Sequence, residues 1–175
     1  MKTLIRLVLV SSFFILTAVS QSNPNWGKWS WLIGEWTGEG SGKPGQGEGV
    51  FSLLPGLDSS ILIRKNHSVY PAANNKPAII HEDLMIVYLD NSGLASKAIY
   101  FDNEKHVISY MVTYSEKSII LTSEKLADTP VFRLVYTLLD KVTVNTKFEM
   151  SQDGQKFMTY IEGKSKRKKV LEHDE

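Results

Sequence analysis

Four side chains that can exchange protons lie close together in the sequence. They are His81, Asp83, Tyr100 and Asp102: an imidazole, two carboxylates and a phenol. The turn signal at 90–93 predicts a hairpin whose register pairs Asp83 with Tyr100 and His81 with Asp102 on one face. Such a group can polarise a ligand, bind a metal or transfer protons. The competing interpretation is a hydrogen-bonded rim that satisfies strand ends.

Three more side chains can join this group. His106 follows Tyr100 after a short turn, and whether the two meet depends on the length of that turn. Arg64 and His67 lie on the long strand predicted before the 71–77 loop. Two histidines and a carboxylate would suit zinc or iron, but the spacing matches no recognised metal motif. We therefore predict no metal site.

Arg133 is a second charged residue within an apolar segment, 131–136. If the turn at 140–141 has two residues, Arg133 pairs with Phe148 and points inward. A buried guanidinium needs a partner, because desolvating an unpaired charge costs several kcal/mol. A carboxylate of the protein or the acidic head of a ligand would serve. An outward Arg133 in a shifted register is the alternative.

Common catalytic signatures are missing from the sequence. It has no cysteine, no Gly-x-Ser-x-Gly elbow, no glycine-rich phosphate loop and no His-Glu-x-x-His helix. This does not exclude an enzyme, because the interior of a barrel can hold an isolated acid–base pair.

The elements that position these residues read as strands. From Trp36 onward the chain keeps a period of two, and turns rich in Gly, Pro, Asn and Asp divide it. Consecutive short hairpins favour an all-β, closed up-and-down antiparallel barrel, which leaves no sheet edge exposed. About ten strands leave room for a small ligand. The predicted strands are 31–40, 46–54, 58–70, 79–89, 94–101, 105–114, 117–123, 130–138, 142–150 and 155–164.

Alternation also predicts which side chains face inward. In 142–150 the even-numbered residues are apolar apart from Thr146, so the even set faces the interior. A turn at 151–154 would pair Phe148 with Phe157 and Thr146 with Thr159. Phe157, Thr159 and Ile161 are then expected to line the same interior.

The N-terminal part contains two segments, a predicted signal peptide in 1–20 and a predicted cap of the barrel in 23–31. Residues 1–20 carry a basic start, an apolar run and small residues before Gln21, which indicates a signal peptide cleaved near Ser20. An uncleaved anchor is the alternative. Residues 21–175 then form a barrel domain, and a cysteine-free secreted chain fits a periplasmic or extracellular location. In 23–31, Pro24 with Trp26 and Trp29 predicts a short helix capping one end of the barrel, with a sugar-stacking platform as the alternative.

The net charge argues against nucleic-acid binding. Lys2 and Arg6, which leave with the signal peptide, are two of 20 basic residues, against 19 acidic ones, so the mature domain is nearly neutral. No stable membrane insertion is expected after signal cleavage, because the apolar run is short and is removed. The sequence does not indicate an oligomeric state.

The motif Gly34-Glu35-Trp36-Thr37-Gly38-Glu39-Gly40 resembles the first strand of calycins, the lipocalin and fatty-acid-binding superfamily, and most closely nitrobindin-type barrels. The resemblance implies structural roles for Gly34, Trp36 and Gly38. It implies that Trp36 packs against a basic residue of a late strand, Arg167 or Lys164. It also implies interior arginines that bind acidic ligand heads.

Haem is a further implication of the resemblance. Nitrobindin-type barrels bind haem through a histidine on the final strand, and here 157–164 contains none. Tyr160 is a possible iron ligand, but alternation points it outward. We therefore predict no cofactor.

The leading hypothesis is a secreted barrel that holds an apolar or amphipathic molecule in its lumen. Inward-facing polar side chains would orient the polar head of this ligand. The alternatives are a barrel enzyme of isomerase, hydratase or hydrolase type with His81 and Asp83 as acid–base pair, a haem-binding barrel, and a barrel filled with side chains that binds a partner. The predicted ligand-binding residues are Arg64, His81, Asp83, Tyr100, His106 and Arg133.

Overall fold

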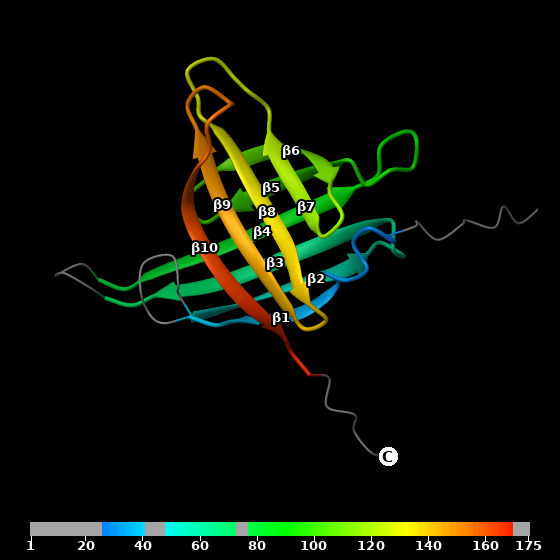
Figure 1. The fold of residues 1–175 in the computed structure, drawn as a ribbon, viewed down its shortest axis with the longest axis horizontal. Helices are drawn as coiled ribbons and strands as arrows, with labels where there is room; N and C mark the ends of the chain where they lie inside the picture. Colours follow the sequence, from blue (N-terminus) through cyan, green and yellow to red (C-terminus); the bar gives the residue numbers. More distant parts are fainter. Residues whose placement is uncertain (1–25, 41–47, 73–76, 170–175) are drawn as a thin grey trace, which may run out of the picture.

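Alternating apolar and polar residues separated by short turns form ten strands in residues 26–40, 48–72 and 77–169, which the computed structural model describes. Each strand pairs antiparallel with its neighbours in sequence, and β1 pairs with β10, so the sheet closes (Figure 1). The predicted all-β, closed up-and-down barrel is confirmed. The strands are β1 (Gly34–Gly38), β2 (Glu48–Gly56), β3 (Ile61–Tyr70), β4 (Ile79–Tyr88), β5 (Lys97–Asp102), β6 (Val107–Tyr114), β7 (Ser118–Ser123), β8 (Val131–Asp140), β9 (Thr143–Ser151) and β10 (Met158–Arg167).

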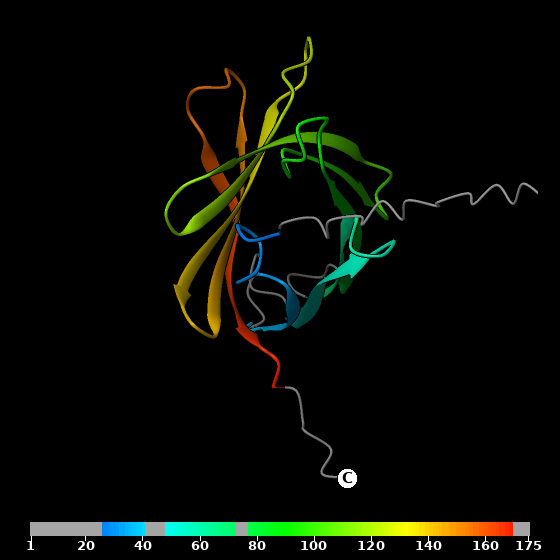
Figure 2. The same ribbon diagram turned by 90° about the vertical axis from the view of Figure 1, so that its right-hand side faces the viewer.

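The inner face of the barrel carries the core. Figure 2 shows the strands curving around a common interior. Within the described ranges there is no α-helix, and so none long and apolar enough to cross a membrane. The side chains that are fully or almost fully buried fill the half of the barrel next to the tryptophans; they include Trp29, Leu32, Trp36, Leu53, Leu62, Met85, Val87 and Ile119.

The tryptophan segment lies across one end of the barrel. Trp29 is fully buried, and its indole N–H donates to the Tyr114 hydroxyl at 2.8 Å. Trp26 donates to the carbonyl of Ser59 in the β2–β3 turn at 2.7 Å. These contacts reach opposite parts of the rim, so we call this the plugged end. Residues 27–32 form consecutive turns, and the start predicted for the helix, at Pro24, lies outside the described residues, as does the predicted signal peptide.

Gly34, Trp36 and Arg167 form one structural unit where β1 meets β10. The Arg167 guanidinium lies over the Trp36 ring, 4.4 Å from its centroid, and donates to the carbonyls of Ile33 (2.7 Å) and Trp31. Gly34 has φ +137°, and a Cβ there would stand 2.5 Å from Arg167 Nη1. Arg167 is therefore the basic partner of Trp36, whereas Lys164 pairs with Asn145. The third structural glycine, Gly38, pairs with Ser165.

Two β-bulges change the register from the predicted one. The first, between Leu138 and Asp140, aligns Arg133 with Glu149 instead of Phe148. The second, between Thr159 and Ile161, follows a long turn and aligns Ile161 with Phe148.

The predicted pairs Phe148–Phe157 and Thr146–Thr159 are therefore wrong. Thr159 aligns with outward-facing Glu149, and the Phe157 ring packs on Arg133 outside the barrel. Only Ile161 of the three residues expected to line the interior, Phe157, Thr159 and Ile161, lies on the inner face.

Candidate functional site

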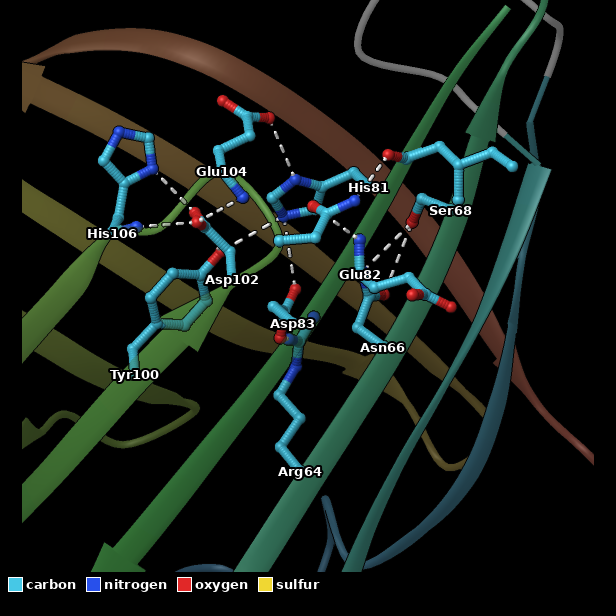
Figure 3. Close-up of polar contacts among 12 residues, drawn as sticks. Arg64, Asn66, Ser68, His81, Glu82, Asp83, Tyr100, Asp102, Glu104 and His106 are labelled. Atoms are coloured by element: carbon cyan, nitrogen blue, oxygen red, sulfur yellow. Dashed lines mark hydrogen bonds and ion pairs between the residues drawn. The ribbon is translucent and has the colours of Figure 1, made fainter.

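Polar side chains gather on the inner face at the end opposite the tryptophans. We call this end the mouth; there β3 ends at Tyr70, β4 begins at Ile79, and β5 ends at Asp102. Figure 3 shows the cluster and the strands that supply it. The even residues of β3, the odd residues of β4 and the even residues of β5 all face inward, which follows from their pairing and burial. The inner polar residues are Arg64, Asn66, Ser68, His81, Asp83, Tyr100 and Asp102.

Arg64 and Asp83 form a buried ion pair at the base of the cluster. Arg64 Nη1 donates to Asp83 Oδ1, and the two side chains are 9% and 4% exposed. Burial disfavours the charged guanidinium, but the Asp83 carboxylate and three nearby phenols together outweigh burial, and the pKa of Arg64 is raised. Arg64 is thus the interior arginine of this barrel, and its partner is a carboxylate of the protein itself.

His81 lies between this ion pair and the rim. Its Nε2 is 3.5 Å from Asp83 Oδ2 and 3.1 Å from the Tyr100 hydroxyl, and its Nδ1 is 3.4 Å from Glu104 Oε1. The hydrogen bond to Asp83 is the main cause of a raised His81 pKa, opposed by burial and aided by Glu104. His81 therefore connects Asp83, Tyr100 and Glu104 into one acid–base group, as Figure 3 shows.

Asp102 organises the 103–106 turn beside this group. Its carboxylate accepts from the backbone N–H groups of Glu104 and His106, and lies 2.8 Å from His106 Nδ1. Burial opposes ionisation, but the bonds from His106 prevail and lower the Asp102 pKa. The Tyr100 hydroxyl also contacts Asp102, at 3.4 Å, so Tyr100 and His106 meet only through this carboxylate.

The predicted cluster is brought together, with two changes. Asp83 aligns with Asp102 and not with Tyr100, which aligns with Met85. This shift is two residues, so every side chain keeps its predicted face. His67 lies on the outer face, where it contacts Glu82 at 3.1 Å, and does not join the group.

Arg133 is corrected to an outward position. Leu134 and Tyr136 of β8 are buried in the core, so the even-numbered residues of this strand face inward. Because successive side chains alternate between faces, Arg133 faces outward. There it donates to Glu149 at 2.7 Å and lies 3.7 Å from the centre of the Phe157 ring. Arg133 therefore does not face the interior, which corrects the prediction from the sequence.

Aromatic side chains form the opposite wall of the mouth. The Phe132 and Phe148 rings stack at 5.6 Å, and the Tyr160 ring meets Phe148 edge-on at 6.4 Å. The bulge at 159–161 turns Tyr160 toward Phe148, which corrects the expectation that it points away from the interior. Tyr160 is 72% exposed and Met158 is also exposed, so this aromatic wall is open to solvent at its upper edge.

Two hollows of the molecular surface lie away from the acid–base group. Side chains fill the plugged half, and two surface hollows, of about 430 and 470 Å³, border β1–β2 and the turn at 90–92. Neither hollow is lined by Arg64, His81 or Asp83. Both hollows are therefore separate from the acid–base group.

The residues present do not fit a haem group bound as in nitrobindin-type barrels. β10 contains no histidine, the residue through which those barrels hold haem. Among the described residues no three His, Asp or Glu side chains are placed to hold a metal ion.

His81 should titrate above its ordinary pKa. A raised pKa in the folded state means that protonated His81 adds stability below about pH 6.5, and that this contribution is lost as the pH rises through the folded pKa. Imidazole NMR titration should give a midpoint above the ordinary value, and Glu104→Gln should lower it. A midpoint at or below the ordinary value would contradict the contacts with Asp83 and Glu104.

Sequence reasoning missed three interior polar residues that the site uses or adjoins. Asn66 and Ser68 share the inner face of β3 with Arg64, and Tyr136 lies on β8 among core residues. The signal for Asn66 and Ser68 was present, because they have the same parity as Arg64 in one strand. Tyr136 was hidden by the register error that pointed Arg133 inward.

The Gly34–Trp36–Arg167 unit matches what the calycin resemblance implies for the junction of the first and last strands. A scan against models of protein families finds no model that matches this chain, and a search of curated proteins finds no match.

Proposed function

We propose that this protein binds a small amphipathic molecule at the mouth of its barrel. The observation that carries the proposal is the division of the inner mouth into two walls of different chemistry. The polar wall comes from β3–β5 and contains Arg64, His81, Asp83 and Tyr100. The aromatic wall comes from β8–β10 and contains Phe132, Phe148 and Tyr160. A molecule with a polar and an apolar part satisfies both.

Two observations support the proposal that one small molecule can reach both walls. The pKa of Tyr70, at the end of β3, is raised first by burial, then by Asp83, and also by the Tyr160 phenol on β10. Deeper in the barrel the Phe51 ring lies 6.1 Å from Tyr136 and 5.3 Å from the Arg64 guanidinium. The walls therefore converge toward the base of the cluster.

The calycin resemblance supports the same class of function. The Gly34–Trp36 motif, the closed antiparallel barrel and the Arg167 stack on Trp36 are consistent with that superfamily. We propose accordingly that the chain is a calycin-like, secreted or periplasmic binding protein whose residues 1–20 act as a signal peptide.

A neutral lipophilic fluorophore tests the proposal. N-phenyl-1-naphthylamine should bind with an increase and a blue shift in its emission, since burial in the aromatic wall removes it from water. Tyr160→Ala removes an exposed ring, so the fold should be retained, and probe affinity should fall about tenfold.

Arg133→Leu is the matched control, because Arg133 lies on the outer face and should leave probe binding unchanged. A protein that binds no probe would overturn the proposal. So would an equal loss of affinity in both variants, which would place the probe outside the mouth.

An acid–base enzyme is a second candidate, favoured by one observation. His81 Nε2 contacts both Asp83 and Tyr100 within the proposed binding site, so a bound molecule would lie beside a titratable imidazole. His81→Gln tests this candidate: an enzyme loses its turnover on substitution, whereas a binding protein shows no chemistry in either form.

A further inference from the structure

Three buried polar atoms near the base of the cluster have no hydrogen-bond partner among the described residues. They are Arg64 Nε, the Tyr136 hydroxyl and Thr146 Oγ1. Tyr136 is fully buried and Arg64 nearly so. A buried polar atom without a partner costs stability, so in folded proteins such an atom is normally satisfied by the protein, an ordered water, an ion or a bound group.

The three atoms come from the converging inner faces. Tyr136 on β8 aligns with Thr146 on β9, so their side chains are neighbours on one face. The Phe51 ring lies against both Arg64 and Tyr136, which connects these two across the interior. All three residues therefore belong to the inner face, and the Phe51 ring lies against two of them, Arg64 and Tyr136.

The hydrogen-bonding chemistry of these atoms selects an acceptor. Arg64 Nε can only donate, and both hydroxyls can donate. Burial raises the pKa of Tyr136 to about 12, with Asp83 acting in the same direction, so its phenol keeps its proton. The group that completes this site is an oxygen or nitrogen acceptor.

The charges nearby argue against an anionic acceptor. Arg64 is already neutralised by Asp83, to which its Nη1 donates. Asp102 and Glu104 lie between this pair and solvent, facing His81 and His106. A carboxylate entering the mouth would add a negative charge to a site whose guanidinium is already paired, and would lose its hydration without a free cation to replace it.

We propose that the ligand carries an uncharged oxygen acceptor, such as the carbonyl of a ketone, aldehyde, ester or amide, which accepts hydrogen bonds from Arg64, Tyr136 and Thr146. This inference rests on the proposed function and specifies the polar head that the mouth takes. An interior arginine without a partner would favour a ligand with an acidic head. Because Arg64 is paired with Asp83, we propose a neutral head instead.

Three naphthalene derivatives of similar shape test the inference by displacement of N-phenyl-1-naphthylamine. 2-acetylnaphthalene carries a neutral carbonyl, 2-naphthoate a carboxylate and 2-ethylnaphthalene no acceptor. The wild type should bind the ketone about tenfold more tightly than either of the others. Tyr136→Phe should remove most of this preference and leave the affinity for 2-ethylnaphthalene unchanged. Thr146→Val is a second variant with the same expected direction.

The control variant is Tyr88→Phe, which removes a hydroxyl from the outer face of β4 and should leave all three affinities unchanged. Since the Tyr136 hydroxyl has no partner in the protein, Tyr136→Phe should also melt at the same temperature as the wild type or higher without ligand. A lower melting temperature would mean that the hydroxyl has a structural role, and would overturn the inference.

The result that separates the two proposals is the binding of the fluorophore itself. If the fluorophore binds but ketone, carboxylate and hydrocarbon displace it equally, the proposed function stands and the inference fails; the three atoms are then served by water. Tighter binding of 2-naphthoate would likewise overturn the inference. If the fluorophore does not bind, the proposed function fails.

Discussion

Asp83→Asn is expected to lower the free energy of unfolding by about 3 to 5 kcal/mol, the usual cost of leaving one partner of a buried ion pair without the other. The amide has nearly the shape of the carboxylate, so packing changes little. What changes is that Arg64, buried and aimed at Asp83, keeps its charge without a counter-ion. Urea unfolding followed by tryptophan fluorescence measures the effect, because Trp29 and Trp36 are fully buried.

The double variant Arg64→Met, Asp83→Leu is the matched control. It removes both charges, and a buried pair replaced by apolar residues often costs little. We expect it to recover most of the stability that Asp83→Asn loses. If Asp83→Asn unfolds within about 1 kcal/mol of the wild type, the pair is not the buried, mutually dependent one described.

Gly34→Ala should destabilise the barrel by about 2 to 3 kcal/mol, because two effects combine at this position. The backbone there has φ +137°, which residues with a side chain rarely adopt. In addition, the new Cβ would stand 2.5 Å from Arg167 Nη1. The guanidinium must then move from its place over Trp36 and from the carbonyls of Trp31 and Ile33.

Gly93→Ala separates these two effects. Gly93 also has a positive φ, +77°, but a Cβ there meets nothing within 4 Å. It should therefore show the backbone cost alone, about 1 kcal/mol. Thermal and urea unfolding of both variants measure the difference, which belongs to the Arg167 contact. Equal destabilisation by the two substitutions would mean that Arg167 moves aside freely.

Most of the architecture could be predicted because strand and turn signals are local. Period-two alternation and the Gly, Pro, Asn and Asp turns identified all ten strands and their antiparallel order. The motif around Gly34 and Trp36 led to a basic residue on a late strand, and the structure selects Arg167 over Lys164. That choice needs the register between the first and last strands, which no local signal carries.

The part of the site on β4 and β5 could be predicted because the predicted register was wrong by an even number of residues, which leaves each side chain on the same face. The β4–β5 pairing differs from the predicted one by two residues, so His81, Asp83 and Tyr100 still meet on the inner face. The β8–β9 pairing differs by one residue because of the bulge near Leu139, and Arg133 moved to the opposite face. A bulge adds one residue without changing composition or alternation elsewhere, so the sequence pattern did not reveal it.

The contacts of Arg167 join the two ends of the described chain. Its hydrogen bonds reach Ile33 and Trp31, which precede it by 134 and 136 residues. Contacts over such separations form late, since the entropy of closing the intervening loop must be overcome first. A nascent chain that still lacks β10 has free edges on β1 and β9, and it remains able to pair with other chains until its last strand is available. Closure of this barrel therefore waits until β10 has been synthesised.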